Sequence, residues 1–138
     1  MAGSPLAKKM KLRADTRAAV VNAPTGYLGA LAPLPAGVEL CETLRGKFGW
    51  IQAFVRSSAE LRRVAPRLVK ALADESLLWL SFPKGTSGIQ TDLTRDSGWD
   101  ALAAADLKWV TLVSVDDTWS AFALRPYKPG EPRQRAWR

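Results

Sequence analysis

The sequence contains no histidine and a single cysteine, Cys41. The absence of histidine excludes a Ser-His-Asp triad, a histidine general base and nearly every kind of zinc site. One cysteine excludes an internal disulfide and a cysteine-rich metal site, and Cys41 is expected to be a small core residue. We therefore expect no metal cofactor, and a reducing, cytoplasmic environment is the simplest location.

Long hydrophobic runs are also missing. No apolar stretch approaches the roughly 18 to 20 residues that a membrane-spanning helix needs, so we expect no membrane partner. The basic N-terminus is not followed by the apolar core of a signal peptide, which argues against secretion. The 138 residues, 47% of them hydrophobic, suit one globular domain.

Positive charge is concentrated at the two ends of the chain. Residues 1–13 and 125–138 each carry a net charge of +4, whereas residues 14–124 carry −1, which accounts for the overall +7. Both ends contain proline, glycine or serine and show little apolar periodicity. We therefore predict flexible basic tails over residues 1–13 and 126–138 around one folded domain over residues 14–125. Such tails either solubilise the protein or act as nucleic-acid-binding arms.

Apolar runs of strand length alternate with helical patterns. Strands are predicted over residues 17–23, 38–41, 50–55, 76–82, 109–115 and 118–124, the last two forming an antiparallel hairpin. Helices are predicted over residues 25–31, with Thr25 as N-cap, from Ser57 or Ser58 to Leu72, and over residues 99–107. This order predicts a Rossmann-like α/β fold, with a mostly parallel sheet, helices on both faces and a C-terminal hairpin.

The second of these helices has the clearest pattern. Its apolar residues recur at spacings of three and four, which places them on one stripe. Its cations, Arg62, Arg63, Arg67 and Lys70, occupy other faces and are most simply a solvated surface. Pro66 lies inside the pattern and is expected to kink the helix.

The densest polar cluster of the chain follows the fourth predicted strand. The loop PKGTSGIQTDLTRDSGW (Pro83–Trp99) is long for a connection without secondary structure, and such loops are often functional. Because parallel strands deliver their following loops to one edge of the sheet, this loop should meet the loop after the first strand. We predict a polar or anionic ligand site formed by Thr25, Tyr27, Lys84, Thr91, Asp92, Arg95 and Asp96.

Within this predicted site Lys84 and Arg95 would be the cationic contacts, and Asp92 and Asp96 would be acceptors that orient them. A purely structural loop explains the same composition. In that alternative Asp96 or Ser97 caps the following helix, and Arg95 pairs with Asp92.

Phosphate-binding motifs are missing from the loops where they would be expected. A dinucleotide site normally shows GxGxxG after the first strand, whereas this chain has NAPTGYLGAL, with Pro24 in the turn. The phosphate loop GxxxxGK followed by Ser or Thr is also absent. Glu42 follows the second predicted strand, where an acidic residue can hold a ribose, but one glutamate is weak support. Asp116 and Asp117 are explained by a hairpin turn, which favours aspartate.

Five segments together resemble a family of small bacterial Rossmann-like proteins known only as a domain of unknown function. They are VVNAPTGYL (Val20–Leu28), LPAGVEL (Leu34–Leu40), FVRSSAEL (Phe54–Leu61), LLWLSFPKGTSGIQTDLTRDSGWDAL (Leu77–Leu102) and VDDTWSAFALR (Val115–Arg125). The family in turn resembles a shortened class I methyltransferase, with SLLWLSFPKG in the place of the fifth strand. The resemblance implies a methyltransferase-like Rossmann fold.

Two departures from the methyltransferase pattern bear on the cofactor. NAPTGYLG replaces the glycine-rich cofactor loop, and Gly49 stands where relatives tend to have aspartate. Glycines let the backbone approach a ligand closely. We therefore expect S-adenosylmethionine to bind weakly or not at all.

The preferred interpretation is a Rossmann-like module without catalytic activity that binds a small polar or anionic ligand or a protein partner. The first alternative is a divergent S-adenosylmethionine-dependent methyltransferase, because methyl transfer can run largely on positioning. The second alternative is a nucleic-acid-binding accessory protein that acts through its basic tails.

Overall fold

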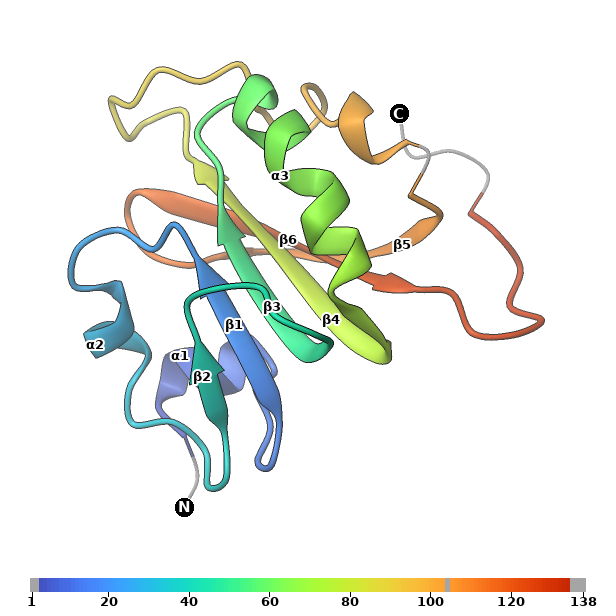
Figure 1. The fold of residues 1–138 in the computed structure, drawn as a ribbon. Helices are drawn as coiled ribbons and strands as arrows, with labels where there is room; N and C mark the ends of the chain where they lie inside the picture. Colours follow the sequence, from blue (N-terminus) through green and yellow to red (C-terminus); the bar gives the residue numbers. More distant parts are fainter. Residues whose placement is uncertain (1–2, 104, 135–138) are drawn as a thin grey trace.

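A computed structural model describes residues 3–103 and 105–134 (Figure 1). These residues form one mixed sheet of six strands in the order β2-β1-β3-β4-β6-β5. The strands are β1 (Arg17–Val21), β2 (Glu39–Cys41), β3 (Phe48–Phe54), β4 (Leu72–Pro83), β5 (Leu107–Ser114) and β6 (Trp119–Pro126). Strands β1 to β4 are parallel, and β6 joins β4 and β5 in antiparallel pairs. The predicted Rossmann-like, methyltransferase-like fold is confirmed.

Helices cover both faces of the sheet. Helix α3 (Ser58–Lys70) and the short 3₁₀ helix η1 (Asp100–Leu102) lie on one face, and α1 (Pro5–Lys9) and α2 (Tyr27–Leu31) lie on the other (Figure 1). Alternation along β1 divides the core accordingly, because Ala19 packs with α3 whereas Ala18 and Val20 pack with α1 and α2. The sheet is therefore the middle of three layers.

Helix α3 begins with the cap that its sequence predicts. The Ser57 hydroxyl accepts a hydrogen bond from the Glu60 amide at 3.1 Å, and the Glu60 carboxylate accepts one from the Arg56 amide at 2.7 Å. The apolar stripe of Leu61, Val64 and Leu68 is buried against the sheet. The helix continues through Pro66, which is exposed on its outer side. No helix in the described residues is long and apolar enough to cross a membrane.

Two predicted features of the helices are wrong. Helix α2 begins after Gly26, which has a φ of 85°, so Thr25 is not its N-cap. The helix predicted over residues 99–107 is reduced to the single turn η1. Asp106 has a left-handed φ of 54°, which a helix cannot accommodate, and β5 already begins at the next residue.

The N-terminal segment is part of the fold, which corrects the prediction of a flexible tail for residues 4–12. Ser4 caps α1 and donates a hydrogen bond to the Leu31 carbonyl at 2.6 Å. The Ala7 and Met10 side chains are fully buried. The Met10 carbonyl accepts hydrogen bonds from the indole N–H groups of Trp50 and Trp79, each at 2.8 Å. The lysines between the two apolar residues concealed their spacing, which places both on one side of the helix.

Residues 126–134 are also anchored, so the predicted C-terminal tail is wrong up to this point, and residues 135–138 lie outside the described residues. Glu131 binds Arg125 at 2.7 Å and Lys108 at 2.9 Å. The Arg125 guanidinium holds the pKa of the Glu131 carboxyl well below its usual range. The Gln134 side chain bonds both backbone groups of Trp109 at 3.0 Å. Glu131 and Gln134 thus tie this end of the chain to β5 and β6.

The buried role of Met10 gives a direct stability prediction. Met10→Ala should lower the free energy of unfolding by about 2–5 kcal/mol, because it leaves a cavity beneath two tryptophans. Lys9→Ala, next to it but exposed, should change it by no more than about 0.5 kcal/mol. Urea unfolding followed by tryptophan fluorescence measures both. Two equally neutral substitutions would show that this segment does not pack on the sheet.

Candidate functional site

The strand order reverses at the carboxyl ends of β1 and β3, and we refer to the region between the loops that follow these two strands as the switch-point crevice. From β1 the chain passes to β2 on one side and then returns to β3 on the other. Loops that follow strands on either side of such a reversal diverge, and open α/β sheets bind ligands there. The loops at this point are residues 22–26 after β1 and residues 55–57 after β3.

The loop after β1 leaves open space beside its backbone. Asn22 and Gly26 have φ values of 59° and 85°, and the Tyr27 amide closes the turn on the Pro24 carbonyl at 3.0 Å. A Cβ atom at Gly26 would meet no other atom within 4 Å. Glu42, which is exposed, follows the neighbouring strand β2. The loop thus has the accessible backbone that a bound ligand requires, provided by one glycine of left-handed conformation.

Buried aromatic side chains pack together beside the end of β3. The Phe54 ring lies edge-on to Tyr27 and Trp119, with centroid distances of 4.7 and 5.0 Å. The Arg56 guanidinium lies 5.4 Å from the centre of the Trp119 ring. This cluster brings the first loop, the end of β3 and the start of β6 together.

The Tyr27 hydroxyl belongs to the core. It donates a hydrogen bond to Gln52 at 2.5 Å, and Gln52 donates in turn to Ser81 at 2.9 Å. Burial raises the pKa of the Tyr27 hydroxyl above its usual value near 10, so it stays protonated as a donor. Tyr27 is only 5% exposed, and its polar atom is therefore occupied within the protein.

A pocket of about 820 Å³ lies at the carboxyl end of β4, on the other side of β3. Apolar side chains from Phe82, Leu93 and Leu112 line it together with polar groups. Lys84 is fixed in its wall by a 2.6 Å hydrogen bond from its ammonium group to the Ser114 hydroxyl. Arg95 also lines the pocket, is exposed, and forms no ion pair with a described residue. The pocket therefore presents two cations.

Asp92 connects this pocket to α3. Its carboxylate accepts hydrogen bonds from the Ser58 amide, at 2.7 Å, and from the Ser58 hydroxyl. The bond from the Ser58 hydroxyl, followed by that from the amide, holds the pKa of the Asp92 carboxyl below its ordinary value. Thr91 accepts from the Leu93 amide at 3.0 Å. Both residues shape the loop after β4 and hold it against the start of α3.

The structure brings together four of the seven predicted ligand residues, since Lys84, Thr91, Asp92 and Arg95 line this one pocket. Thr25 is exposed on the first loop and Tyr27 is buried, and neither lines it. The predicted single pocket joining both loops is wrong because β3 lies between β1 and β4. The loop after β4 is instead held on the α3 side through Asp92.

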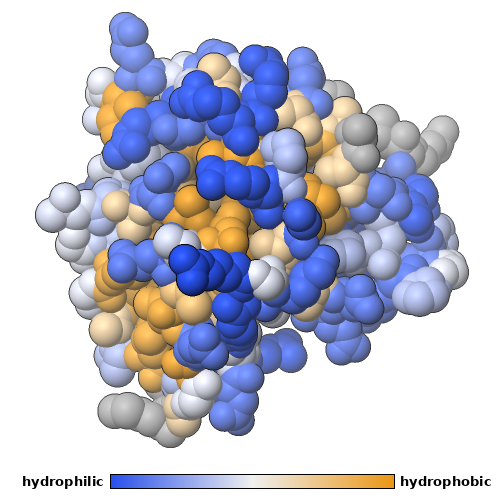
Figure 2. Space-filling model, in the orientation of Figure 1, coloured by the Kyte–Doolittle hydropathy of each residue, from blue (hydrophilic) through white to orange (hydrophobic). Residues whose placement is uncertain are grey.

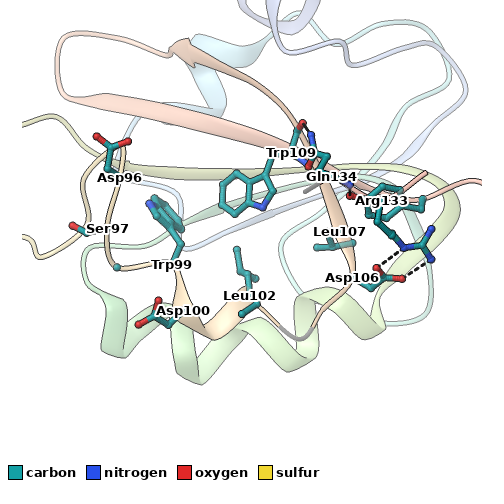
Figure 3. A pocket seen from close by; sticks show the side chains of 13 residues that line it. Asp96, Ser97, Trp99, Asp100, Leu102, Asp106, Leu107, Trp109, Arg133 and Gln134 are labelled. Carbon is teal, nitrogen blue, oxygen red and sulfur yellow. Dashed lines mark hydrogen bonds and ion pairs between the residues drawn. The ribbon is translucent and has the colours of Figure 1, made fainter. Parts of the chain in front are cut away.

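Asp96 lines a second pocket, of about 330 Å³, which the sequence did not indicate (Figure 3). Trp99 and Trp109 form its wall, and Arg133 binds Asp106 through two bonds of 2.8 and 2.9 Å (Figure 3). The Arg133 guanidinium also stacks 4.2 Å above the Tyr127 ring centre. The charged groups of Arg133 and Asp106 in this pocket therefore bind each other. The sequence did not indicate this pocket, because Arg133 lies in a segment that was predicted to be a flexible tail.

The described residues contain no candidate metal-binding site. Cysteine, aspartate and glutamate side chains form no group of three or more that could hold a metal ion within residues 3–103 and 105–134. Asp116, one of the paired turn aspartates, accepts from the amides of Thr118 and Trp119, both at 2.8 Å. This is the turn role that its sequence position indicated.

Comparison with known proteins gives structural likeness only. No protein-family model matches the sequence, and no curated protein matches it. Similar solved structures include a ribosomal protein L11 methylase from Lactobacillus delbrueckii subsp. bulgaricus, with a TM-score of 0.53 and 17% identity over 81% of this chain and 71% of that one. A TehB-like SAM-dependent methyltransferase from Corynebacterium glutamicum has a TM-score of 0.57 and 10% identity, over 88% and 85%.

One similar structure contains the cofactor. A mutant of MtNAS in complex with S-adenosylmethionine has a TM-score of 0.56 and 12% identity, over 88% of this chain and 59% of that chain. At these identities the likeness establishes the fold. It corrects our preferred interpretation of a non-catalytic module, because several of the similar structures are named as methyltransferases, which favours the methyltransferase alternative.

Asp92 makes stability depend on pH in a defined direction. Its pKa is depressed in the folded state, so its stabilising contribution is present above the unfolded pKa of about 3.9 and is lost as pH falls through the folded value. Asp92→Asn should therefore lower the urea midpoint at pH 7, and its difference from wild type should shrink below about pH 4. Asp117→Asn, at an exposed turn position, should leave the midpoint nearly unchanged. A pH-independent effect of Asp92→Asn would contradict this role.

Proposed function

We propose that the chain is a divergent S-adenosylmethionine-dependent methyltransferase. The observation that carries the proposal is that the switch point of the sheet, after β1 and β3, and a polar pocket, after β4, lie at the same edge of the sheet. Methyl transfer requires such a pair, one place for the cofactor and one for the acceptor. The fold shared with methyltransferases supports the same assignment.

The crevice fits the cofactor through two features. Gly26 offers backbone that a ligand can approach without meeting a side chain. Glu42, just after β2, is an exposed carboxylate of the kind that accepts hydrogen bonds from ribose hydroxyls. When bound, S-adenosylmethionine supplies an electrophilic methyl group. The expectation that it binds weakly gave too much weight to the missing glycine motif, because one open glycine can leave the same space.

The pocket after β4 would hold the acceptor. Lys84 and Arg95 place two positive charges at its wall, which suits a polar or anionic acceptor. The apolar side chains of Phe82 and Leu93 line the same space and offer it an apolar surface. Asp92 and Thr91 act as positioning residues, because their polar atoms hold the loop in shape. With no histidine in the chain, the chemistry would depend on orientation of the acceptor rather than on a histidine base.

The test is titration calorimetry with S-adenosylhomocysteine on wild type and two glycine variants. We expect wild type to bind with a dissociation constant below about 1 mM, and Gly26→Ala to bind at least about tenfold more weakly, a loss of about 1.4 kcal/mol. Gly130→Ala is the matched control. Gly130 also has a left-handed φ, 78°, and open space around it, so both variants carry a similar backbone cost of about 1–2 kcal/mol.

The comparison separates ligand contact from backbone strain. If Gly130→Ala weakened binding as much as Gly26→Ala, the effect would be one of stability and the crevice would be misplaced. Absence of any binding heat for wild type at millimolar ligand would refute the methyltransferase proposal.

A further inference from the structure

The exposed side of α3 carries positive charge almost exclusively. Arg62, Arg63, Arg67 and Lys70 are all exposed, and we refer to these four side chains as the basic face. At about 100° per residue they fall within an arc of about 140°, opposite the buried stripe. In Figure 2 the α3 side of the molecule shows many hydrophilic residues, with hydrophobic ones visible among and beside them.

These four charges form no ion pair within the described residues, although Arg62 attracts the Asp92 carboxylate electrostatically. None of the four side chains forms a hydrogen bond or ion pair there. Glu60, the one acidic residue of α3, is occupied by the Arg56 amide. Arg63 and Arg67 are four residues apart, a spacing at which like charges destabilise a helix. A face that is only solvated normally mixes both signs, so an anionic partner explains this one better.

A second group of cations on the surface is mixed with carboxylates. A cavity of about 610 Å³ near the amino ends of β1 and β3 gathers several cations. Its lining contains the carboxylates of Asp15, Asp74 and Glu75 and the cations of Lys11, Arg13, Arg17, Arg125 and Lys128. Of these cations, Arg17 binds Glu39 and Arg125 binds Glu131. Such a mixture does not favour a polyanion, whereas the basic face of α3 does.

The basic face begins at the rim of the pocket after β4. Ser58, the first residue of α3, is bonded to Asp92 in the pocket wall. Arg62 lies four residues further on, one turn along the same side of the helix. Arg95, which lines the pocket, is exposed as well. Positive charge therefore extends from the pocket along the outside of α3.

We propose that the basic face is a docking surface for single-stranded nucleic acid, which runs from α3 toward the pocket after β4. Arginine binds phosphate through paired hydrogen bonds, which lysine cannot form. Between Arg62 and Lys70 the helix rises about 12 Å, so the basic face is long enough to contact more than one phosphate of a strand. The further inference that this nucleic-acid strand also supplies the methyl acceptor rests on the proposed function.

Two other anionic partners fit less well. A membrane-bound helix turns its apolar side outward, whereas α3 buries its apolar stripe in the core. The exposed large hydrophobic side chains of the described residues are Val110 and Leu112, both on β5. Among the exposed residues of α3 none has an aromatic or large aliphatic side chain, so a protein partner would lack the apolar core that a stable interface needs.

The test is fluorescence anisotropy of the full chain with labelled 12-nucleotide RNA and DNA of one sequence, without cofactor. Arg63→Glu combined with Arg67→Glu should weaken binding at least about tenfold. It should also reduce the salt slope by about 1.4, or about 0.7 for each lost phosphate contact. The matched control is Lys8→Glu with Lys9→Glu, which makes the same charge change at exposed positions around α1. It should weaken binding less than about threefold. The RNA and DNA arms show which strand is preferred.

Circular dichroism checks that each variant is folded, and Arg63→Gln with Arg67→Gln provides a second, milder test that should also weaken binding. Equal losses in the α3 and α1 variants would overturn the proposal, as would no binding to either strand. Tighter binding to phosphatidylserine vesicles or to polyglutamate than to RNA would overturn it too. Nucleic-acid binding without S-adenosylhomocysteine binding would support the docking surface and refute the methyltransferase, and the reverse result would remove only the docking surface.

Discussion

The position of β3 in the sheet is the constraint on which the other features depend. It lies between β1 and β4, and all its residues except Gly49 are buried. Since β2 lies on the far side of β1, the chain must reverse direction across the sheet, which opens the crevice between β1 and β3. The same strand separates that crevice from the pocket after β4. One arrangement therefore yields two neighbouring sites instead of the single pocket that the loops suggested.

The net charge of the chain does not show which of its cations are paired with carboxylates. Two cations near the C-terminal end are structural, because Arg125 binds Glu131 and Arg133 binds Asp106. The cations of α3 have no such partners in the described residues. The interaction surface is therefore expected on the folded domain, beside the proposed acceptor pocket, and not on its termini. This distribution follows from which basic residues the fold places next to acidic ones.

The sequence predicts those parts of the fold that local patterns encode. Apolar runs located all six strands of the described sheet, and the Ser57–Glu60 cap located the start of α3. The sequence did not predict contacts between residues that lie far apart along the chain. Nothing local indicates that the Met10 carbonyl accepts from two tryptophans, or that Asp92 binds Ser58. Four of the predicted site residues share a pocket because they belong to one loop. The placement of Thr25 in the same site depended on a strand order that the sequence did not specify.

The central claim is that the β1–β3 crevice binds an S-adenosyl ligand. The most direct measurement is a titration of ¹⁵N-labelled protein with S-adenosylhomocysteine, followed by amide chemical shifts. The account predicts the largest shifts at Gly26, Glu42 and Arg56, with the amides around Trp99 and Trp109 unaffected. Unchanged spectra at millimolar ligand, or shifts confined to the pocket around Trp99 and Trp109, would contradict it.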